Sequence, residues 1–259
     1  MPTFIHETAI VNPGASIGND CYVGPFSTIG ESVVLGKRVR LDSHVVIDGD
    51  TNVGDDTRVF PFVSIGLAPQ DLKYAGEPTA TAIGARNQIR EFVTIHRGTS
   101  GGGGLTKIGD DNLLMAQAHV AHDCQIGSKV IMANAATLAG HVEIADRANV
   151  GAYSGVHQFC RVGYEAFVGG YSVVVKDAPP FAIIQGNHAK CYGLNRVGMK
   201  RRGYSKETIE KLHRAYHLLL SAKLNTSQAL EKIKAEIADC KEVDMLVEFY
   251  ETTTRGVVK

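Results

Sequence analysis

The sequence lacks the features that direct a chain to a membrane or to a polyanion. Its 27 Lys and Arg residues equal its 27 Asp and Glu residues in number, so no net charge draws it toward nucleic acid or an anionic surface. No apolar run approaches the roughly 18 residues of a membrane-spanning helix, and no signal-peptide pattern is visible. We therefore expect no nucleic-acid partner and no membrane insertion.

Cysteine is also scarce, and its distribution excludes a disulfide framework. The five residues form an odd, scattered set with no C-x-x-C pair: Cys21, Cys124, Cys160, Cys191 and Cys240. Such a set is typical of a reducing compartment, which predicts a cytoplasmic protein.

The feature that is present is a repeat of six residues. Stepping by six from Val11 meets only aliphatic residues as far as Ile65, fails at Asp71 and Glu77, and resumes at Ile83. After a slip of one residue near position 100, the repeat runs from Ile108 to Val174. A fixed short period of this length predicts a solenoid built from short strands.

Two further columns follow the same period. Two residues before each repeat position stands a small or β-branched residue, as at Cys21, Val45 and Ala136, and strand alternation predicts that both columns point inward. Glycine often follows the repeat position, as at Gly18 and Gly54, and we expect these glycines to form sharp corners between flat faces.

This pattern resembles the hexapeptide-repeat proteins, which implies a left-handed parallel β-helix with three hexapeptides per triangular turn. Residues 18 apart then stack on adjacent rungs. We predict an all-β left-handed parallel β-helix of hexapeptide repeats over residues 1–187, with external loops at about 67–80 and 97–106. A small α-helical C-terminal domain, residues 188–259, follows the Pro179-Pro180 stop. Ser205 and Asn225 or Thr226 are candidate helix N-caps.

Five histidines lie in the middle of the repeats: His96, His119, His122, His141 and His157. The 18-residue stacking places His122, Gly140 and Gln158 in one column and Asp123 and His141 in the next. A base with an acidic neighbour beside an unobstructed backbone N–H suits acyl transfer, in which one group removes a proton and another holds the oxyanion.

Other interpretations of these residues stay open. His119-x-x-His122 with further histidines nearby is compatible with zinc, although no cysteine or glutamate ligand supports it, and Cys124 and Cys160 fall in the inward column. The glycine-rich segment 97–106 is a mobile flap or simply slack. The basic cluster Lys200-Arg201-Arg202 either faces solvent or meets a pyrophosphate or an acidic partner.

Beyond the repeat, several segments match one family. The segments are 70–78 (QDLKYAGEP), 94–99 (TIHRGT), 119–124 (HVAHDC), 137–141 (TLAGH), 156–159 (VHQF), 185–188 (QGNH) and 200–203 (KRRG). Together they resemble the UDP-N-acetylglucosamine O-acyltransferases, which open lipid A biosynthesis.

The resemblance implies roles for named residues. His122 is the expected general base, Asp123 its orienting partner, and the Gly140 N–H the oxyanion donor in attack on an (R)-3-hydroxyacyl carrier protein. It also implies a homotrimer with sites between subunits, and no cofactor or metal. The residues it places around UDP-N-acetylglucosamine are Asp71, Lys73, His96, His119, His141, His157 and Gln158, with Asn195 and Arg201 at the nucleotide end.

The resemblance further places a length-setting position for the acyl chain at Gly170, in a column of mostly small residues with Ala116, Asn134 and Ala152. We expect a chain of roughly fourteen carbons, since each buried methylene adds about 0.8 kcal/mol. Val197 departs from the family, whose members often have an acidic residue there; losing a buried contact of that kind weakens nucleotide binding by about 1–3 kcal/mol.

Three alternatives to the O-acyltransferase are carried forward. They are a related sugar-nucleotide N-acyltransferase, a metal-dependent hydratase of the gamma-carbonic-anhydrase type, whose members share this coil, and a non-catalytic β-helical scaffold. The N-acyltransferase would differ from the O-acyltransferase in its acceptor, which is an amine. The hydratase would require zinc, and the scaffold would show no turnover.

Overall fold

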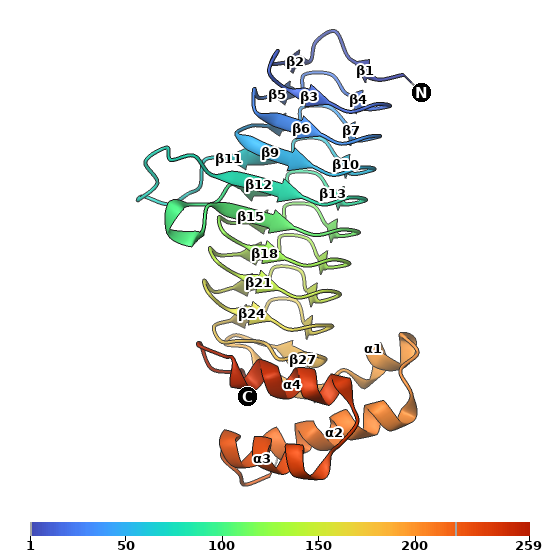
Figure 1. Ribbon diagram of the computed structural model, residues 1–259, viewed down its shortest axis with the longest axis vertical. Coiled ribbons are helices and arrows are strands. Elements are labelled where there is room, and N and C mark those ends of the chain that lie inside the picture. The colour runs from blue at the N-terminus through green and yellow to red at the C-terminus, as the bar shows by residue number, and fades with distance from the viewer. Residues whose placement is uncertain (1, 221) are drawn as a thin grey trace.

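The computed structural model describes residues 2–220 and 222–259. The chain winds into a long triangular prism with left-handed turns, and its helices gather at the C-terminal end (Figure 1). Three sheets form the sides of the prism. Within each sheet, uninterrupted rungs pair in parallel at a separation of 18 residues, as Phe4 with Tyr22 and Thr137 with Gly155. The predicted left-handed parallel β-helix is confirmed.

Each of the three sheets, A, B and C, consists of short strands. Sheet A contains β1 (Phe4–Ile5), β4 (Tyr22–Val23), β7 (Arg40–Leu41), β10 (Arg58–Val59), β13 (Gln88–Ile89), β16 (Leu113–Leu114), β19 (Ile131–Met132), β22 (Asn149–Val150), β25 (Phe167–Val168), β27 (Ala182–Gln185) and β28 (Lys190–Leu194). Sheet B contains β2 (Ile10–Val11), β5 (Thr28–Ile29), β8 (Val46–Ile47), β11 (Ser64–Leu67), β14 (Thr94–His96), β17 (His119–Val120), β20 (Thr137–Leu138), β23 (Gly155–Val156) and β26 (Val173–Val174). Sheet C contains β3 (Ser16–Ile17), β6 (Val33–Leu35), β9 (Asp50–Val53), β12 (Ala80–Ile83), β15 (Leu105–Ile108), β18 (Gln125–Ile126), β21 (Glu143–Ile144) and β24 (Arg161–Val162).

The core is the pair of inward columns that the repeat predicts. From Val23 to Val174 the repeat positions are buried, and so are the residues two places earlier, including Cys124 and Cys160. Val11 and Ile17 are only partly buried, because no rung lies above the first one to cover them. Stacked aliphatic side chains thus fill the prism along its length.

The prediction that glycine forms the sharp corners is wrong. The left-handed backbone occurs three residues after most repeat positions, where it is occupied by residues such as Asp20, Phe26 and Arg38. Glycine directly after the repeat position instead permits close approach between rungs: a Cβ at Gly18 would lie 2.4 Å from the carbonyl oxygen of Gly36. At Gly18 the requirement is space against the next rung and not a positive φ, whereas Gly66, beside the first insertion, has a φ of 75°.

Both predicted insertions leave the prism at the corner between sheets B and C. Ser64 pairs with Thr94, 30 residues later (94 − 64), and Thr94 pairs with His119, 25 residues later (119 − 94), in place of the usual 18. The first insertion lies between β11 and β12, and the second, between β14 and β15, contains the short 3-10 helix η1 (Ser100–Gly102). Both project from the same side of the prism (Figure 1).

The coil closes with a hairpin and then gives way to helices. β27 and β28 pair in antiparallel fashion, and the proposed domain boundary after residue 187 falls in the turn between them.

The helices are α1 (Arg196–Arg201), which the sequence did not predict, α2 (Lys206–Leu220), α3 (Thr226–Glu236) and α4 (Lys241–Glu251). Ser205 Oγ accepts from Thr208 N (3.0 Å) and Asn225 forms a capping box, as expected. Among the described helices, none has the length and apolarity needed to cross a bilayer.

Candidate active site

Two columns of polar residues lie at the corner where the chain passes from sheet B to sheet C. His122, Gly140 and Gln158 occupy equivalent places on consecutive rungs, and His141 N donates to His122 O over 3.0 Å. Asp123 and His141 stand one residue further, both in the left-handed region with φ of 61°. The structure therefore has the stacking that the 18-residue spacing predicts.

His122 and Asp123 form a hydrogen-bonded pair. The distance from His122 Nδ1 to Asp123 Oδ2 is 2.8 Å, and the carboxylate is fully buried while the His122 ring is partly accessible. Because an ionised carboxylate only accepts, Nδ1 carries the proton and Nε2 presents its lone pair. The pair thus has the arrangement of a general base with its orienting acid.

The His122 ring lies against the backbone of Gly140. A Cβ added at Gly140 would stand 2.5 Å from His122 Cε1 and 2.8 Å from Nε2. Any side chain at position 140 would therefore clash with the His122 imidazole in its observed position. The Gly140 N–H has no hydrogen-bond partner among the described residues.

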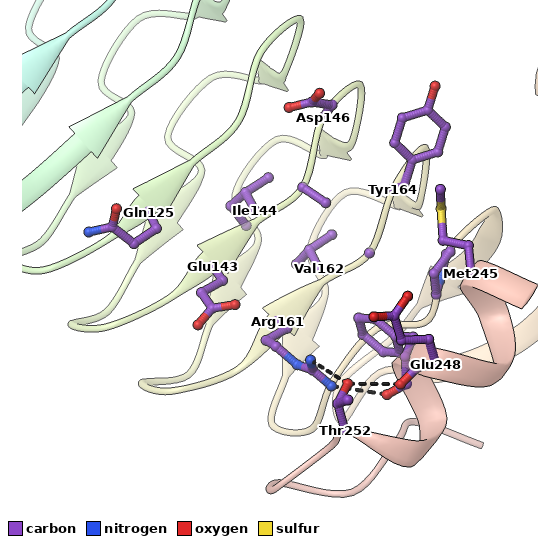
Figure 2. Close-up of a pocket in the computed structure, with 14 residues that line it drawn as sticks. Gln125, Glu143, Ile144, Asp146, Arg161, Val162, Tyr164, Met245, Glu248 and Thr252 are labelled. Carbon is purple, nitrogen blue, oxygen red and sulfur yellow. Dashed lines mark hydrogen bonds between the residues drawn. The ribbon is translucent and has the colours of Figure 1, made fainter.

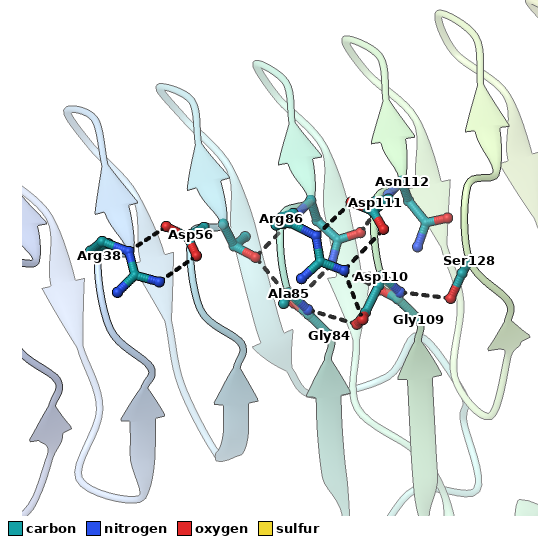
Figure 3. A network of polar contacts seen from close by, with 12 residues as sticks. Arg38, Asp56, Gly84, Ala85, Arg86, Gly109, Asp110, Asp111, Asn112 and Ser128 are labelled. Carbon is teal, nitrogen blue, oxygen red and sulfur yellow. Dashed lines mark hydrogen bonds and ion pairs between the residues drawn. The ribbon is translucent and has the colours of Figure 1, made fainter.

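Elsewhere in the coil, the N–H group at this repeat position binds oxyanions. Ala85 N, two residues after a repeat position, donates to Asp110 Oδ1 over 2.8 Å (Figure 3), and Ser128 N donates to Asp146 Oδ1 over 2.7 Å. The corner geometry of this fold thus presents an N–H that holds a carboxylate oxygen. At Gly140 the same donor has no carboxylate partner within residues 2–220 and 222–259, which leaves it available to a ligand.

Burial favours the uncharged form of two neighbouring histidines, His96 and His119. Burial, assisted by His119 and His122, lowers the pKa of His96 to about 4. Burial also lowers the pKa of His119, whose Nδ1 is 2.6 Å from Thr94 Oγ1. His96 Nδ1 is buried and has no partner in the described part of the chain. These rings offer neutral donors and acceptors to a ligand.

The first insertion brings Asp71 into electrostatic range of this corner. Burial lowers the pKa of His141, whereas the charges of Asp123 and Asp71 oppose that shift. Asp71 Oδ1 also accepts from Lys73 N over 3.0 Å, which shapes the turn of the insertion.

His122, Asp123 and His141 place possible metal-ligating atoms within 4.8 Å of one another. The carboxylate, however, already accepts from Thr99 N (2.8 Å), from Thr99 Oγ1 (2.6 Å) and from His122. A metal ion would have to displace these donors, so the contacts describe a hydrogen-bonded pair and not a preformed metal site.

Other predicted residues lie elsewhere in the single chain. Asn195 caps α1, with its Oδ1 accepting from Gly198 N over 2.9 Å. α1 lies on the opposite side of the molecule from the insertions (Figure 1). Gly170 stands at the corner between sheets A and B, one rung below Ala152. The chain by itself does not bring Asn195, Arg201 or Gly170 to His122.

The basic cluster is partly used within the chain. Arg202 Nη1 lies 3.2 Å from the buried carboxylate of Glu165, and Arg202 Nη2 donates to the carbonyl oxygen of Arg147 over 3.2 Å. These contacts attach the end of α1 to the corner between sheets C and A. Lys200 and Arg201 are exposed and remain candidates for an anionic ligand.

Three residues of this corner were given no role from the sequence, although Phe159 and Thr99 lie in the segments that resemble the family. Phe159 stacks on His141 with ring centroids 4.4 Å apart, and the 18-residue register would have found it. Arg255 Nη2 reaches His157 Nδ1 (3.2 Å) from the C-terminal tail, and Thr99 reaches Asp123 from the second insertion. Neither of these two follows from any periodicity.

The second insertion, for which the sequence left open a mobile flap or slack, is bonded to other segments in the structure. Besides the bonds of Thr99 to Asp123, Ser100 N and Oγ donate to Glu77 Oε1 over 3.2 and 3.1 Å. The two insertions are therefore joined to each other and to the coil.

Two cavities follow the face of sheet C below this corner. One of about 620 Å³ adjoins Asp123, His141 and Phe159. The other, of about 490 Å³, lies between the coil and α4 (Figure 2). Arg161 borders both and ties α4 to the coil, donating to Thr252 Oγ1 (3.1 Å) and to the carbonyl oxygen of Phe249 (3.0 Å). Open space therefore reaches the Asp123 corner from the C-terminal end.

Comparison with known proteins gives matches over nearly the whole chain. Residues 177–258 match the model of the second domain of UDP-N-acetylglucosamine O-acyltransferase, and residues 14–49 and 105–140 match the bacterial transferase hexapeptide repeat. The chain is 49% identical over 255 residues to the acyl-[acyl-carrier-protein]--UDP-N-acetylglucosamine O-acyltransferase of Thermodesulfovibrio yellowstonii, covering 98% of this chain and 99% of that one.

Solved structures agree with this relationship. LpxA from Acinetobacter baumannii is 44% identical with a TM-score of 0.96, covering 98% of this chain and 99% of that one. LpxA from Bacteroides fragilis, a UDP-N-acetylglucosamine acyltransferase, is 39% identical with a TM-score of 0.97, covering 99% and 100%. The similarity therefore includes the coil, both insertions and the helical domain.

Proposed function

Because the chain belongs to the UDP-N-acetylglucosamine O-acyltransferase family, we propose that it transfers an (R)-3-hydroxyacyl group from acyl carrier protein to the 3-hydroxyl of UDP-N-acetylglucosamine, the first step of lipid A synthesis. The observation that carries the proposal is the His122–Asp123 pair beside the backbone N–H of Gly140, which bonds to none of the residues that the structure describes. This arrangement suits an alcohol that must lose a proton while a carbonyl oxygen gains charge.

In the proposed mechanism His122 acts as general base. Its Nε2 takes the proton of the sugar hydroxyl as that oxygen bonds to the thioester carbonyl carbon. Asp123 keeps the proton on Nδ1 and stabilises the imidazolium that forms. The charge that develops on the carbonyl oxygen is held by the Gly140 N–H.

The tetrahedral adduct then collapses. The carbon–sulfur bond breaks, and the carrier thiol leaves with the proton that His122 returns, so the histidine is neutral again. No group of the protein needs to form a bond to the acyl chain. Burial raises the pKa of the nearest thiol in this corner, Cys124, to about 12, which disfavours a thiolate nucleophile.

We propose that the sugar nucleotide lies against the histidines of the sheet B face and the first insertion. His96, His119, His141, His157, Gln158, Asp71 and Lys73 are the proposed contacts. Asn195 and Arg201, which lie across the prism from His122, are proposed to reach the nucleotide of a neighbouring subunit's site. This division requires an oligomer, and we propose a homotrimer.

An exposed aromatic ladder supports the trimer. At the corner between sheets A and B the rings of Phe26, His44, Phe62 and Phe92 stack on successive rungs, with centroids 5.1, 4.8 and 5.1 Å apart. The three phenylalanines are exposed in the single chain. Exposed apolar surface of this kind is typical of an interface between subunits.

The free cysteines of the chain fit the cytoplasm, which we propose as its compartment.

We propose that Gly170 limits the length of the acyl chain. Its added Cβ would meet only backbone atoms of Ala152, the nearest at 3.2 Å, so a larger side chain would project from the corner. Gly170→Met should therefore shift selectivity from donors of roughly fourteen carbons toward shorter ones. Competition between acyl carrier donors of different lengths, read by product mass, measures the shift. Unchanged selectivity would refute the role of Gly170.

The function is tested by mixing the protein with UDP-N-acetylglucosamine and (R)-3-hydroxyacyl carrier protein and following product mass. We expect one ester at the 3-oxygen, with activity unaffected by a chelator, from a sample whose mass in light scattering is three times that of the chain. Preference for an amino-sugar acceptor would favour the N-acyltransferase. Stoichiometric zinc and chelator sensitivity would favour the hydratase, and binding without turnover the scaffold.

A further inference from the structure

The glycine-rich second insertion contacts Asp123, the side chain that supports the proposed base. Thr99 is buried and donates twice to Asp123, from its N to Oδ1 over 2.8 Å and from its Oγ1 to Oδ2 over 2.6 Å. The backbone N–H of Asp123 in turn donates to Thr106 Oγ1 over 2.8 Å. Residues near both ends of the insertion, Thr99 and Thr106, are therefore bonded to Asp123.

The two bonds of Thr99 fix the orientation of the carboxylate. Oδ1 is held by the backbone of Thr99, and Oδ2 is shared between the Thr99 hydroxyl and His122 Nδ1. Because the carboxylate is fully buried, no solvent replaces a donor that is lost. Rotation of the carboxylate would move Oδ2 away from the imidazole.

Gly102, in η1 of the second insertion, packs directly against the same carboxylate. A Cβ at Gly102 would lie 2.0 Å from Asp123 Cγ and 2.3 Å from Oδ2, so only glycine permits the observed contact. A Cβ at Gly101, one residue earlier in η1, would have nothing within 4 Å. Gly101→Ala and Gly102→Ala therefore differ in one respect, the contact with Asp123.

We propose that Thr99 and Gly102 form a clamp that positions Asp123, and through it His122, for proton transfer. The clamp explains why a glycine-rich insertion stands at this corner: it brings a buried donor to a carboxylate that the coil leaves uncovered. Thr99 acts through Asp123 and is a positioning residue. The inference rests on the proposed function, in which His122 is the base.

The hydroxyl is tested by Thr99→Val, which keeps the shape and the backbone donor and removes only the side-chain donor. We expect kcat to fall about 10- to 100-fold, since hydrogen bonds to charged groups are among the strongest in proteins. The KM for UDP-N-acetylglucosamine should stay unchanged, because Thr99 is buried and its N–H and hydroxyl are bonded to Asp123. Thr99→Ser, which restores the donor, should restore most of kcat.

The glycine pair gives a second test that does not depend on the hydroxyl. We expect Gly102→Ala to lower kcat about 10-fold or more at unchanged KM, and Gly101→Ala to behave as the wild type. Equal kcat in Gly101→Ala and Gly102→Ala, or wild-type kcat in Thr99→Val, would overturn the clamp. Thermal unfolding of each variant shows whether the fold is retained.

The clamp can fail without the proposed function failing. If His122→Ala loses turnover while Thr99→Val and Gly102→Ala keep it, the base stands and the clamp is wrong. If His122→Ala keeps turnover, the proposed base itself is wrong.

Discussion

His122→Ala is expected to lower kcat by about 10²- to 10⁴-fold, the usual contribution of a general base. The imidazole is the group whose lone pair is free at this corner, since its Nδ1 is engaged with the buried carboxylate of Asp123. Removing the ring leaves the Gly140 N–H and the substrate contacts in place. The loss should therefore appear in kcat, with a small change in the KM for the sugar nucleotide, in steady-state assays of product formation.

The control for this variant is His213→Ala, which removes an exposed histidine of α2 far from the corner. It should retain wild-type kcat. Both proteins should show the unfolding temperature and oligomeric mass of the parent. A His122→Ala enzyme with wild-type kcat would contradict the assignment of the base.

Gly140→Ala is expected to cost at least about 10²-fold in kcat. The added methyl carbon would lie 2.5 Å from His122 Cε1, so the imidazole or the rung must move, and a displacement of about 1 Å at a reacting group has an effect of that size. The backbone donor remains in this variant. A loss of kcat in this variant would therefore result from displacement of the His122 imidazole and not from removal of the Gly140 N–H.

Gly101→Ala is the matched control for this change, because it adds the same methyl group to a nearby glycine that has open space around it. A crystal structure of Gly140→Ala should show the imidazole displaced from its place over residue 140. Full activity with an unmoved ring would show that the contact is not needed.

The regular part of the site could be predicted from sequence because the coil repeats by a fixed rule. Once three hexapeptides make a turn, positions 122 and 140 must stack, and the bond from His141 N to His122 O has that register. The inward columns followed from the same rule, including the burial of Cys124. Strand alternation and stacking leave few alternatives for such residues.

The irregular parts could not be predicted, because their contacts are set by tertiary structure. Thr99 reaches Asp123 from an insertion outside the repeat, and Arg255 reaches His157 from the C-terminal tail, 98 residues away. The corner conformation was also wrongly attributed to glycine, because the sequence shows where Gly18 lies and not which atom of the next rung approaches it. The six-residue period does not predict which atoms from other segments or rungs will contact these residues.

The central claim is that the acyl group passes directly from carrier to sugar while His122 moves only a proton. Intact-protein mass measured after incubation with acyl carrier donor, without sugar nucleotide, tests this most directly. The account predicts an unchanged protein mass and no release of carrier thiol until UDP-N-acetylglucosamine is added. A protein heavier by one acyl group, with thiol released before the sugar arrives, would contradict it.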